Sequence, residues 1–167
     1  MGSGKSTLGR RLAALLRLPF LDLDDAFEAA AGMSIAEFFA AEGEAEFRRL
    51  EAQVLGERLR AEPQVLATGG GAILNPQNRV ELRRASWVIW LDPSFETIRE
   101  HIGVDAGRRR PLVEQLGFAG LRNLHQARRP YYAETAHLRS GVEKIAPARL
   151  ARELSLQLDQ LQTGISE

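Results

Sequence analysis

The sequence begins with a short glycine-rich motif, GSGKST, at residues 2–7. It matches the second half of the phosphate-binding P-loop pattern G-x-x-x-x-G-K-[ST]. Glycines let successive backbone N–H groups turn toward an anion, and Lys5 adds a charge for the outer phosphates. The alternative, a flexible Gly/Ser start with no ligand, is disfavoured because an amphipathic helix follows at once. The predicted phosphate-binding residues are Gly2, Ser3, Gly4, Lys5, Ser6 and Thr7.

Composition narrows the classes of protein to which the chain can belong. The 167 residues suit one domain of ~100–200 residues, and a hydrophobic content of 44% is sufficient for a core. The 22 basic and 22 acidic residues balance, so no net field favours nucleic acid or an anionic membrane. The lack of cysteine excludes disulfides and thiolate metal sites. No apolar run approaches the ~20 residues that span a bilayer, so a cytoplasmic protein is expected.

Short apolar segments alternate with helical patterns along the chain. This alternation predicts a three-layer α/β/α fold with a parallel sheet and helices on both faces. A first helix follows the glycine-rich motif and is expected to end at Pro19. Two later helices are expected to end at about His101 and at Arg128-Arg129-Pro130-Tyr131-Tyr132. The predicted strands cover about 20–23, 65–68, 87–91 and 138–142.

Acidic residues and glycines follow two of these strands. Ligands of parallel α/β sheets bind at the carboxyl ends of strands, so Asp22 and Asp24 lie where chemistry is expected. For Asp24, the cap of a following helix is an equally good interpretation. Gly69, Gly70 and Gly71 end the strand at 65–68 and permit close approach of the backbone to a ligand, the alternative being a structural turn.

Arginines mark two further segments. Arg48 lies near the start of the longest helical pattern, and it could also be a surface partner of Glu44 or Glu51. The stretch Gly103–Leu112 is glycine-punctuated and basic, which predicts a mobile lid that closes over a polyanion, with a solvated basic loop as the alternative. Nucleic-acid binding is disfavoured because no aromatic residues interleave with the arginines.

Read together, these residues resemble the shikimate kinase family, of the nucleoside-monophosphate-kinase-like branch of P-loop proteins. The resemblance covers nearly the whole chain and includes six motifs in order. They are GSGKST at 2–7, D-x-D at Asp22 and Asp24, G-E-x-x-F-R-x-x-E at Gly43, Glu44, Phe47, Arg48 and Glu51, the glycines at 69–71, R-P-L at 110–112 and R-x-P-x-Y at Arg128, Pro130 and Tyr132.

The resemblance implies ATP-dependent phosphorylation of the 3-hydroxyl of shikimate to shikimate 3-phosphate, in the route to chorismate and aromatic amino acids. It implies one kinase domain over 1–167, with short substrate-binding helices at about 24–62 and a lid at about 102–115. Shikimate and ATP are the expected partners, with Mg²⁺ as cofactor, no nucleic acid, no membrane and a monomeric protein.

The resemblance also assigns roles to individual residues. The carboxylate of shikimate is expected to bind Arg48 and Arg128, and its hydroxyls Asp24 and the glycines at 69–71. Asp24 is expected to orient or deprotonate the attacking hydroxyl. Charge on the transferring phosphoryl group is expected to be stabilised by Lys5 and by Arg110, a lid residue that also contacts ATP. Mg²⁺ is expected to bind the hydroxyl of Ser6, and Asp22 through a water.

The sequence departs from the family pattern in two places. His101, with Arg99 nearby, stands where the family usually has an arginine beside the adenine. The central strand of the sheet, between the strands at 65–68 and 87–91, is missing from the chain. Its absence leaves buried backbone groups unpaired at ~1–3 kcal/mol each, so we hypothesise that Met1 is an internal methionine of a longer natural chain.

Two other functions remain as alternatives. A gluconate-kinase-like enzyme shares the P-loop and the lid, but it does not predict Arg48, Arg128 and three glycines together. A non-catalytic ligand-binding module of the shikimate-kinase type is expected to have lost the acidic residue and an arginine of the site. Asp24, Arg48, Arg110 and Arg128 are all present.

Overall fold

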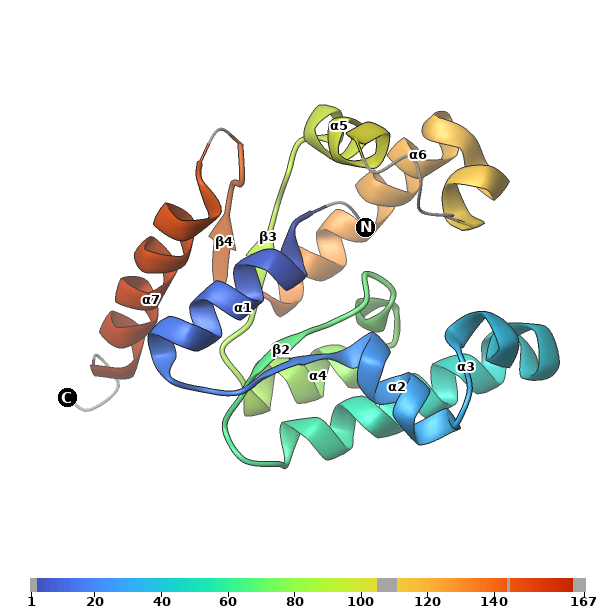
Figure 1. Ribbon diagram of the computed structural model, residues 1–167, viewed down its shortest axis with the longest axis horizontal. Coiled ribbons are helices and arrows are strands. Elements are labelled where there is room, and N and C mark those ends of the chain that lie inside the picture. Colours follow the sequence, from blue (N-terminus) through green and yellow to red (C-terminus); the bar gives the residue numbers. More distant parts are fainter. Residues whose placement is uncertain (1–2, 105–110, 144, 164–167) are drawn as a thin grey trace.

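The computed structural model describes residues 3–104, 111–143 and 145–163, with the side chains of 103–104 and 111–115 excluded (Figure 1). Helices and strands alternate, which confirms the predicted α/β class. Within this part of the chain, no helix is both long and apolar enough to cross a membrane. The elements are α1 (Lys5–Leu16), β1 (Phe20–Asp22), α2 (Leu23–Ala31), α3 (Ile35–Leu59), β2 (Val65–Ala67), a 3₁₀ turn η1 (Ala72–Leu74), α4 (Pro76–Ala85), β3 (Ile89–Leu91), α5 (Phe95–Val104), α6 (Pro111–Thr135), β4 (Leu138–Ser140) and α7 (Pro147–Thr163).

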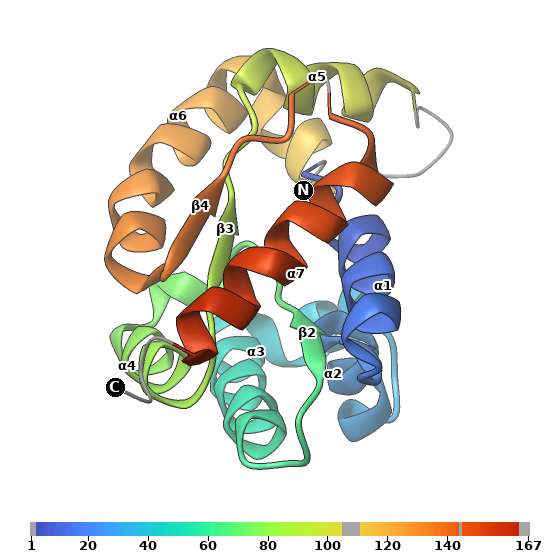
Figure 2. The same cartoon turned by 90° about the vertical axis from the view of Figure 1, so that its left-hand side faces the viewer.

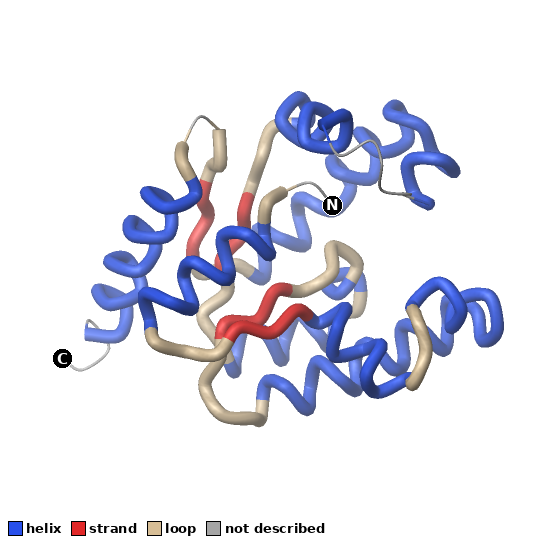
Figure 3. Tube along the Cα trace, in the orientation of Figure 1, coloured by secondary structure: helices blue, strands red, loops and turns tan. Residues whose placement is uncertain are grey.

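The four strands form two separate parallel pairs (Figure 3). β1 pairs with β2, with Phe20 opposite Val65, and β3 pairs with β4, with Ile89 opposite Leu138. Among the described residues, no strand pairing joins β2 to β3. Each strand has three residues, fewer than predicted, and β1 ends early because Asp22 already caps α2.

Three helix ends differ from the predictions. α1 ends at Leu16, because Arg17 adopts the left-handed conformation (φ 55°) before Pro19 is reached. α5 continues to Val104 rather than to His101. α6 runs past Arg128 to Thr135 with Pro130 inside it, so the prediction that it ends there was wrong. Pro130 has no backbone N–H, so α6 lacks one hydrogen bond at this point. The helix tolerates this loss because the turn that follows Pro130 is held by contacts with other parts of the fold.

The region between β1 and β2 forms a helical arm on one side of the molecule. α3 begins with the capping box of Ser34 and Glu37 and bends at Gly43, which has a positive φ of 78°. Its two halves meet α2 through a cluster of aromatic rings with centroids 4.5 to 5.1 Å apart. The cluster contains Phe27, Phe38, Phe39 and Phe47 and directly precedes Arg48.

Two main hydrophobic clusters match the two strand pairs. α1 and α7 lie side by side and pack against β3 and β4 (Figure 2). α2, α3 and α4 pack against β1 and β2. The first cluster contains Leu8, Leu12, Leu150, Ala151, Leu154 and Leu158, and the second Leu23, Ala26, Val54, Leu55, Ile73 and Leu82.

An ionic cluster joins the end of β3 to α6 and β4. The Asp92 carboxylate, 8% exposed, accepts hydrogen bonds from Arg129 (Nη2 to Oδ2, 2.9 Å) and Arg139 (Nε to Oδ2, 2.9 Å). Both guanidinium groups also lie over the Trp90 ring, at 5.1 and 4.9 Å from its centroid. A single buried carboxylate therefore holds two cations from two different elements.

Replacing Asp92 is expected to destabilise the fold. Asp92→Asn removes the charge that both arginines share, which should cost about 2 kcal/mol of unfolding free energy. The midpoint of thermal unfolding should fall by roughly 4–8 °C for a chain of this size. Arg139→Gln is the matched control, because Arg139 is 61% exposed and an exposed ion pair contributes at most ~1 kcal/mol. Equal midpoints for the Asp92 variant and the parent would contradict the assignment.

Candidate active site

The phosphate-binding motif lies at the start of α1. Gly4 caps the helix in the left-handed conformation (φ 79°), which a side chain would strain. No side chain of the described residues caps this end, so the first N–H groups of the helix stay available to an anion. Ser3 is half-buried and Thr7 exposed beside them, while Gly2 lies outside the described residues.

Two residues of the motif reach the end of β1. Ser6 Oγ donates a hydrogen bond to Asp22 Oδ2 at 2.7 Å, and Lys5 Nζ lies 3.5 Å from the same oxygen. A hydroxyl and a carboxylate side by side are the hard oxygen donors that Mg²⁺ prefers. The described residues hold no cluster of three or more acidic or histidine ligands. The donor set therefore fits an ion that completes its shell with water and phosphate oxygens.

Asp22 and Asp24 have different places in the structure. Asp22 is the cap of α2 and its Oδ1 accepts a hydrogen bond from the Asp24 N–H at 3.3 Å. The alternative in which Asp24 is the cap is therefore wrong. The Asp24 side chain remains accessible in the first turn of α2 and faces the glycine turn after β2.

The environment of Asp24 favours its protonated form. Solvent reaches the carboxylate, but the surrounding protein removes enough water to raise the pKa of Asp24 above its ordinary value of 3.8. The positive charge of Lys5 opposes this increase, and the negative charge of Asp22 adds to it. An accessible carboxylate with a raised pKa has the properties of a proton acceptor.

Three side chains that the sequence predicts to bind the substrate lie around the glycine turn at 69–71. They are Asp24, Arg48 and Arg128. A Cβ on Gly69 would lie 3.3 Å from Asp24 Oδ1, and a Cβ on Gly70 would lie 3.4 Å from Arg128 Nη1. A Cβ on Gly71 would lie 2.5 Å from Arg48 Nη1. The structure therefore brings α2, α3, α6 and the end of β2 together, and a side chain at any of the three glycines would press against a residue of this group.

Arg48 is held by acidic residues on both sides. It forms ion pairs with Glu51 (Nη1 to Oε2, 2.8 Å) and with Glu44 (Nη2 to Oε1, 3.5 Å). The alternative of a helical ion pair is thus correct, but Glu51 is only 4% exposed and lies beside Gly69, so the pair is not a surface feature. Burial raises the pKa of Glu51, and the hydrogen bond from Arg48 opposes this. Sequence reasoning did not assign Glu51 to the site, although its spacing from Arg48 was visible.

Arg128 differs from Arg48 because it forms no ion pair with an acidic side chain among the described residues. Its Nε atom is buried without a hydrogen bond, and the described residues contribute no ion pair to it. Burial lowers the pKa of Arg128, and the nearby charge of Arg48 contributes to the decrease. Two guanidinium groups at one turn, one of them unpaired, form a suitable site for a carboxylate or another planar anion.

Tyr132 supports the glycine turn from α6. Its hydroxyl donates a hydrogen bond to the Gly70 carbonyl oxygen at 3.0 Å, one turn of helix beyond Arg128. Burial raises the pKa of Tyr132, so the phenol stays protonated and able to donate. The R-x-P-x-Y spacing contained this residue, but local sequence could not show that it contacts a turn 62 positions earlier.

Part of the predicted site falls outside the described residues. Residues 105–110 of the predicted lid at 102–115, which include Arg110, lie there, between the end of α5 and the start of α6. Arg99 and His101 are exposed on α5.

Comparisons with known proteins agree on one family. The sequence model of the shikimate kinase family matches residues 1–159. The chain is 44% identical to the shikimate kinase of Symbiobacterium thermophilum, over 96% of this chain and 92% of that protein. It is 45% identical to the shikimate kinase of Paracidovorax citrulli, over 95% and 87% of the two chains.

Solved structures give the same result. Shikimate kinase from Acinetobacter baumannii, in complex with shikimate, superposes with a TM-score of 0.87 and 38% identity, over 97% of this chain and 89% of that one. Shikimate kinase from Aquifex aeolicus superposes with a TM-score of 0.76 and 34% identity, over 98% and 94%.

Proposed function

The chain belongs to the shikimate kinase family, and we propose on that premise that it transfers the γ-phosphoryl group of ATP to the 3-hydroxyl of shikimate. The observation that carries the proposal is the convergence of Asp24, Arg48 and Arg128 on the glycine turn at 69–71. The products are shikimate 3-phosphate and ADP. The reaction belongs to the route to chorismate and the aromatic amino acids.

The acceptor is held by the two arginines and the glycine turn. Arg48 and Arg128 bind the carboxylate of shikimate through planar, charge-assisted hydrogen bonds. The buried Glu51 keeps Arg48 in place, and Tyr132 keeps Gly70 in place. The glycine turn leaves room for the ring of the acceptor, whose hydroxyls bind backbone N–H groups and the Asp24 carboxylate.

The transfer itself depends on positioning and on charge. Asp24 accepts the proton of the 3-hydroxyl of shikimate. The hydroxyl oxygen attacks the γ-phosphorus of ATP in line, and the bond between this phosphorus and the ADP oxygen breaks. Lys5 leaves Asp22 for the phosphates and, with Arg110, stabilises the charge on the transferring group. Ser6 and Asp22, the latter through a water, would hold Mg²⁺, which when bound neutralises phosphate charge.

Three further features complete the proposal. The segment at about 102–115 closes over ATP as a lid, and Arg99 and His101 on α5 lie on the adenine side. The protein acts as a monomer in the cytoplasm, without nucleic acid or membrane. Size-exclusion chromatography with light scattering tests the monomer, and a dimer mass would contradict it.

A coupled ADP-release assay tests the reaction. Shikimate, quinate, gluconate and nucleoside monophosphates are compared as acceptors, with and without a chelator of Mg²⁺. We expect turnover with shikimate and its loss on chelation. Equal turnover with gluconate would overturn the substrate assignment. Shikimate binding in calorimetry without any turnover would instead favour the non-catalytic module.

Gly71→Ala is expected to displace Arg48 without unfolding the protein. The new Cβ would overlap the Arg48 guanidinium, which can move because it is the end of a flexible side chain. We expect kcat/KM for shikimate to fall by about 10- to 100-fold, with an almost unchanged unfolding midpoint. Gly56→Ala is the matched control, since its Cβ would lie 3.4 Å from its nearest neighbour in ordinary contact. An equal loss in both variants would contradict the assigned role of the turn.

A further inference from the structure

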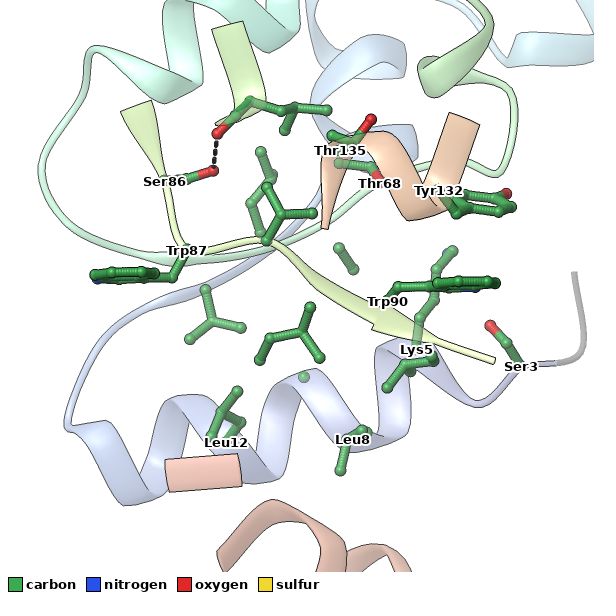
Figure 4. Close-up of a pocket in the computed structure, with 18 of the residues that line it drawn as sticks. Ser3, Lys5, Leu8, Leu12, Thr68, Ser86, Trp87, Trp90, Tyr132 and Thr135 are labelled. Atoms are coloured by element: carbon green, nitrogen blue, oxygen red, sulfur yellow. Dashed lines mark hydrogen bonds between the residues drawn. The ribbon is translucent and has the colours of Figure 1, made fainter. Parts of the chain in front are cut away.

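The Tyr132 phenol, which holds the glycine turn, is itself held by the Trp90 ring of β3. The two rings stack with their centroids 5.8 Å apart and their planes 20° apart. Figure 4 shows them nearly parallel, with Trp90 on the strand and Tyr132 on α6. Stacked aromatic rings attract each other beyond the apolar area that they bury, so the stack restricts where the phenol can lie.

The Trp90 ring has a fixed place in the fold. It is 8% exposed and belongs to the middle residue of β3, which pairs with β4. The guanidinium groups of Arg129 and Arg139 lie over the ring, and the Asp92 carboxylate holds both of them. A ring packed against two cations of one ionic cluster is a rigid support for the phenol that stacks on it.

The phenol acts on one peptide group of the glycine turn, the group that joins Gly70 to Gly71. The Tyr132 hydroxyl donates a hydrogen bond to the Gly70 carbonyl oxygen at 3.0 Å. This peptide is trans and therefore planar, so the same hydrogen bond sets the direction of the Gly71 N–H. In the described part of the chain, that N–H has no backbone acceptor. Gly71 also lies beside Arg48, so the orientation of this peptide bears directly on the acceptor site.

We propose that Trp90 is a positioning residue of the acceptor site, which fixes the Tyr132 phenol and thereby the Gly70–Gly71 peptide. Without the stack, the phenol can turn away from the Gly70 carbonyl. Binding of the acceptor should then weaken more than the transfer step slows, because Asp24 and Lys5 stay in place. The inference rests on the proposed function for the identity of the acceptor, whereas the link from Trp90 to the turn is a property of the free protein.

Trp90→Leu removes the aromatic face and tests the proposal in the ADP-release assay. We expect KM for shikimate to rise by about 10-fold, with kcat falling by less than about 3-fold. KM does not depend on how much of the protein is folded, so a purely structural role of Trp90 would leave it unchanged. Trp90→Phe keeps a ring for the stack and should restore KM to within about 2-fold of the parental value.

Trp87→Leu is the matched control for the loss of a tryptophan. Trp87 lies directly before β3, is half-buried, and packs against His137 and the hydrophobic cluster of α1 and α7. Its replacement should lower the unfolding midpoint but leave KM for shikimate at the parental value.

A double-mutant cycle with Tyr132→Phe tests the path from Trp90 to the turn. Tyr132→Phe keeps the stack and removes the hydroxyl, so alone it should raise KM about as much as Trp90→Leu does. When Trp90→Leu is added to Tyr132→Phe, KM should rise by less than about 2-fold more, because the second change breaks a link that is already lost.

The amide resonance of Gly71 in a ¹⁵N–¹H correlation spectrum gives a readout that needs no turnover. A hydrogen bond to the Gly70 carbonyl polarises the peptide and so changes the chemical shift of the following N–H. The resonance should move in the same direction in Trp90→Leu and Tyr132→Phe and stay in place in Trp87→Leu. If the parent protein does not phosphorylate shikimate, the proposed function fails, and these spectra of the free protein still decide the link.

The inference would be overturned by a Gly71 resonance that does not move in Trp90→Leu. In an active enzyme, equal KM values for Trp90→Leu and Trp87→Leu would also overturn it, since Trp90 would then have a structural role only. Independent, multiplicative effects of Trp90→Leu and Tyr132→Phe on KM would mean that Trp90 does not act through Tyr132. If Trp90→Leu does not fold, Trp90→Met, which is closer to tryptophan in reach, replaces it in each measurement.

Discussion

Asp24→Asn is expected to lower kcat for shikimate phosphorylation by about 10²- to 10⁴-fold, because an amide cannot accept the proton of the attacking hydroxyl. The substitution preserves shape and hydrogen-bonding reach, so KM should change by only a few-fold. Asp25→Asn, on the same turn of α2 and exposed, is the matched control and should retain parental kcat. Steady-state kinetics with the ADP-release assay measure both. An Asp24 variant with more than a tenth of parental kcat would contradict the assigned role.

The pH dependence of the unfolding free energy gives a second test of Asp24, and a purely structural residue would not reproduce it. Its folded pKa is raised, so between 3.8 and that value the folded state binds more protons than the unfolded state. The unfolding free energy therefore decreases as pH rises through this window, and the full penalty is present at neutral pH. Asp24→Asn removes the penalty, so its unfolding midpoint should equal or exceed that of the parent at pH 7, with the difference disappearing below pH ~3.8.

The pH profile of the reaction should show the same shift. The acidic limb of kcat/KM reports the free enzyme's proton acceptor. Because the pKa of Asp24 is raised, this limb should lie at higher pH than for an ordinary aspartate. A limb at or below pH 3.8 would contradict the assignment of Asp24 as the base.

Arg128→Ala is expected to raise KM for shikimate by about 100-fold or more, equivalent to ~3 kcal/mol of binding energy. The buried Nε of Arg128 has no hydrogen-bond partner among the described residues, and removal of the guanidinium would leave the carboxylate of shikimate with Arg48 alone. Arg128→Lys should recover little, because an ammonium cannot form the planar bidentate pair. In both variants kcat at saturation should fall much less than in Asp24→Asn.

Two measurements distinguish a loss of shikimate binding in Arg128→Ala from a loss of folding. The unfolding midpoint of Arg128→Ala should not decrease much, since the buried Nε has no partner to lose. Arg84→Ala on α4 is the control, because this arginine is exposed and has only a helical ion pair with Glu81. A KM unchanged in Arg128→Ala would remove this residue from the carboxylate site.

The order of motifs along the chain was sufficient to predict the α/β class and the residues grouped around the glycine turn. Asp24 was singled out by its place after a strand and Arg48 by its place on a helix, whereas the substrate-binding roles of Arg48 and Arg128 came from the resemblance to shikimate kinases. Glu51 and Tyr132 were not selected. Their roles depend on contacts with Gly69 and Gly70, which are formed between elements distant in sequence.

Predictions from short stretches of sequence were least accurate at the ends of helices and strands. Pro130 normally ends a helix, but α6 continues because the buried Thr135, 1% exposed, donates to the Tyr131 carbonyl and Tyr132 anchors the same turn to Gly70. Asp22 rather than Asp24 caps α2, since the cap depends on the residue at which the strand stops. Both outcomes were set by packing that no short window of sequence contains.

The amino-acid sequence alone was sufficient to predict a phosphate site, because glycines before a lysine at the start of a helix provide N–H groups and a charge for an anion. The prediction of an acidic, hydroxylated acceptor came from the resemblance of the motifs to those of shikimate kinases. Only the tertiary structure decided how these groups work together. The raised pKa of Asp24 and the buried Nε of Arg128, which has no hydrogen-bond partner among the described residues, arise from long-range packing, which places each group in surroundings that its sequence neighbours do not provide.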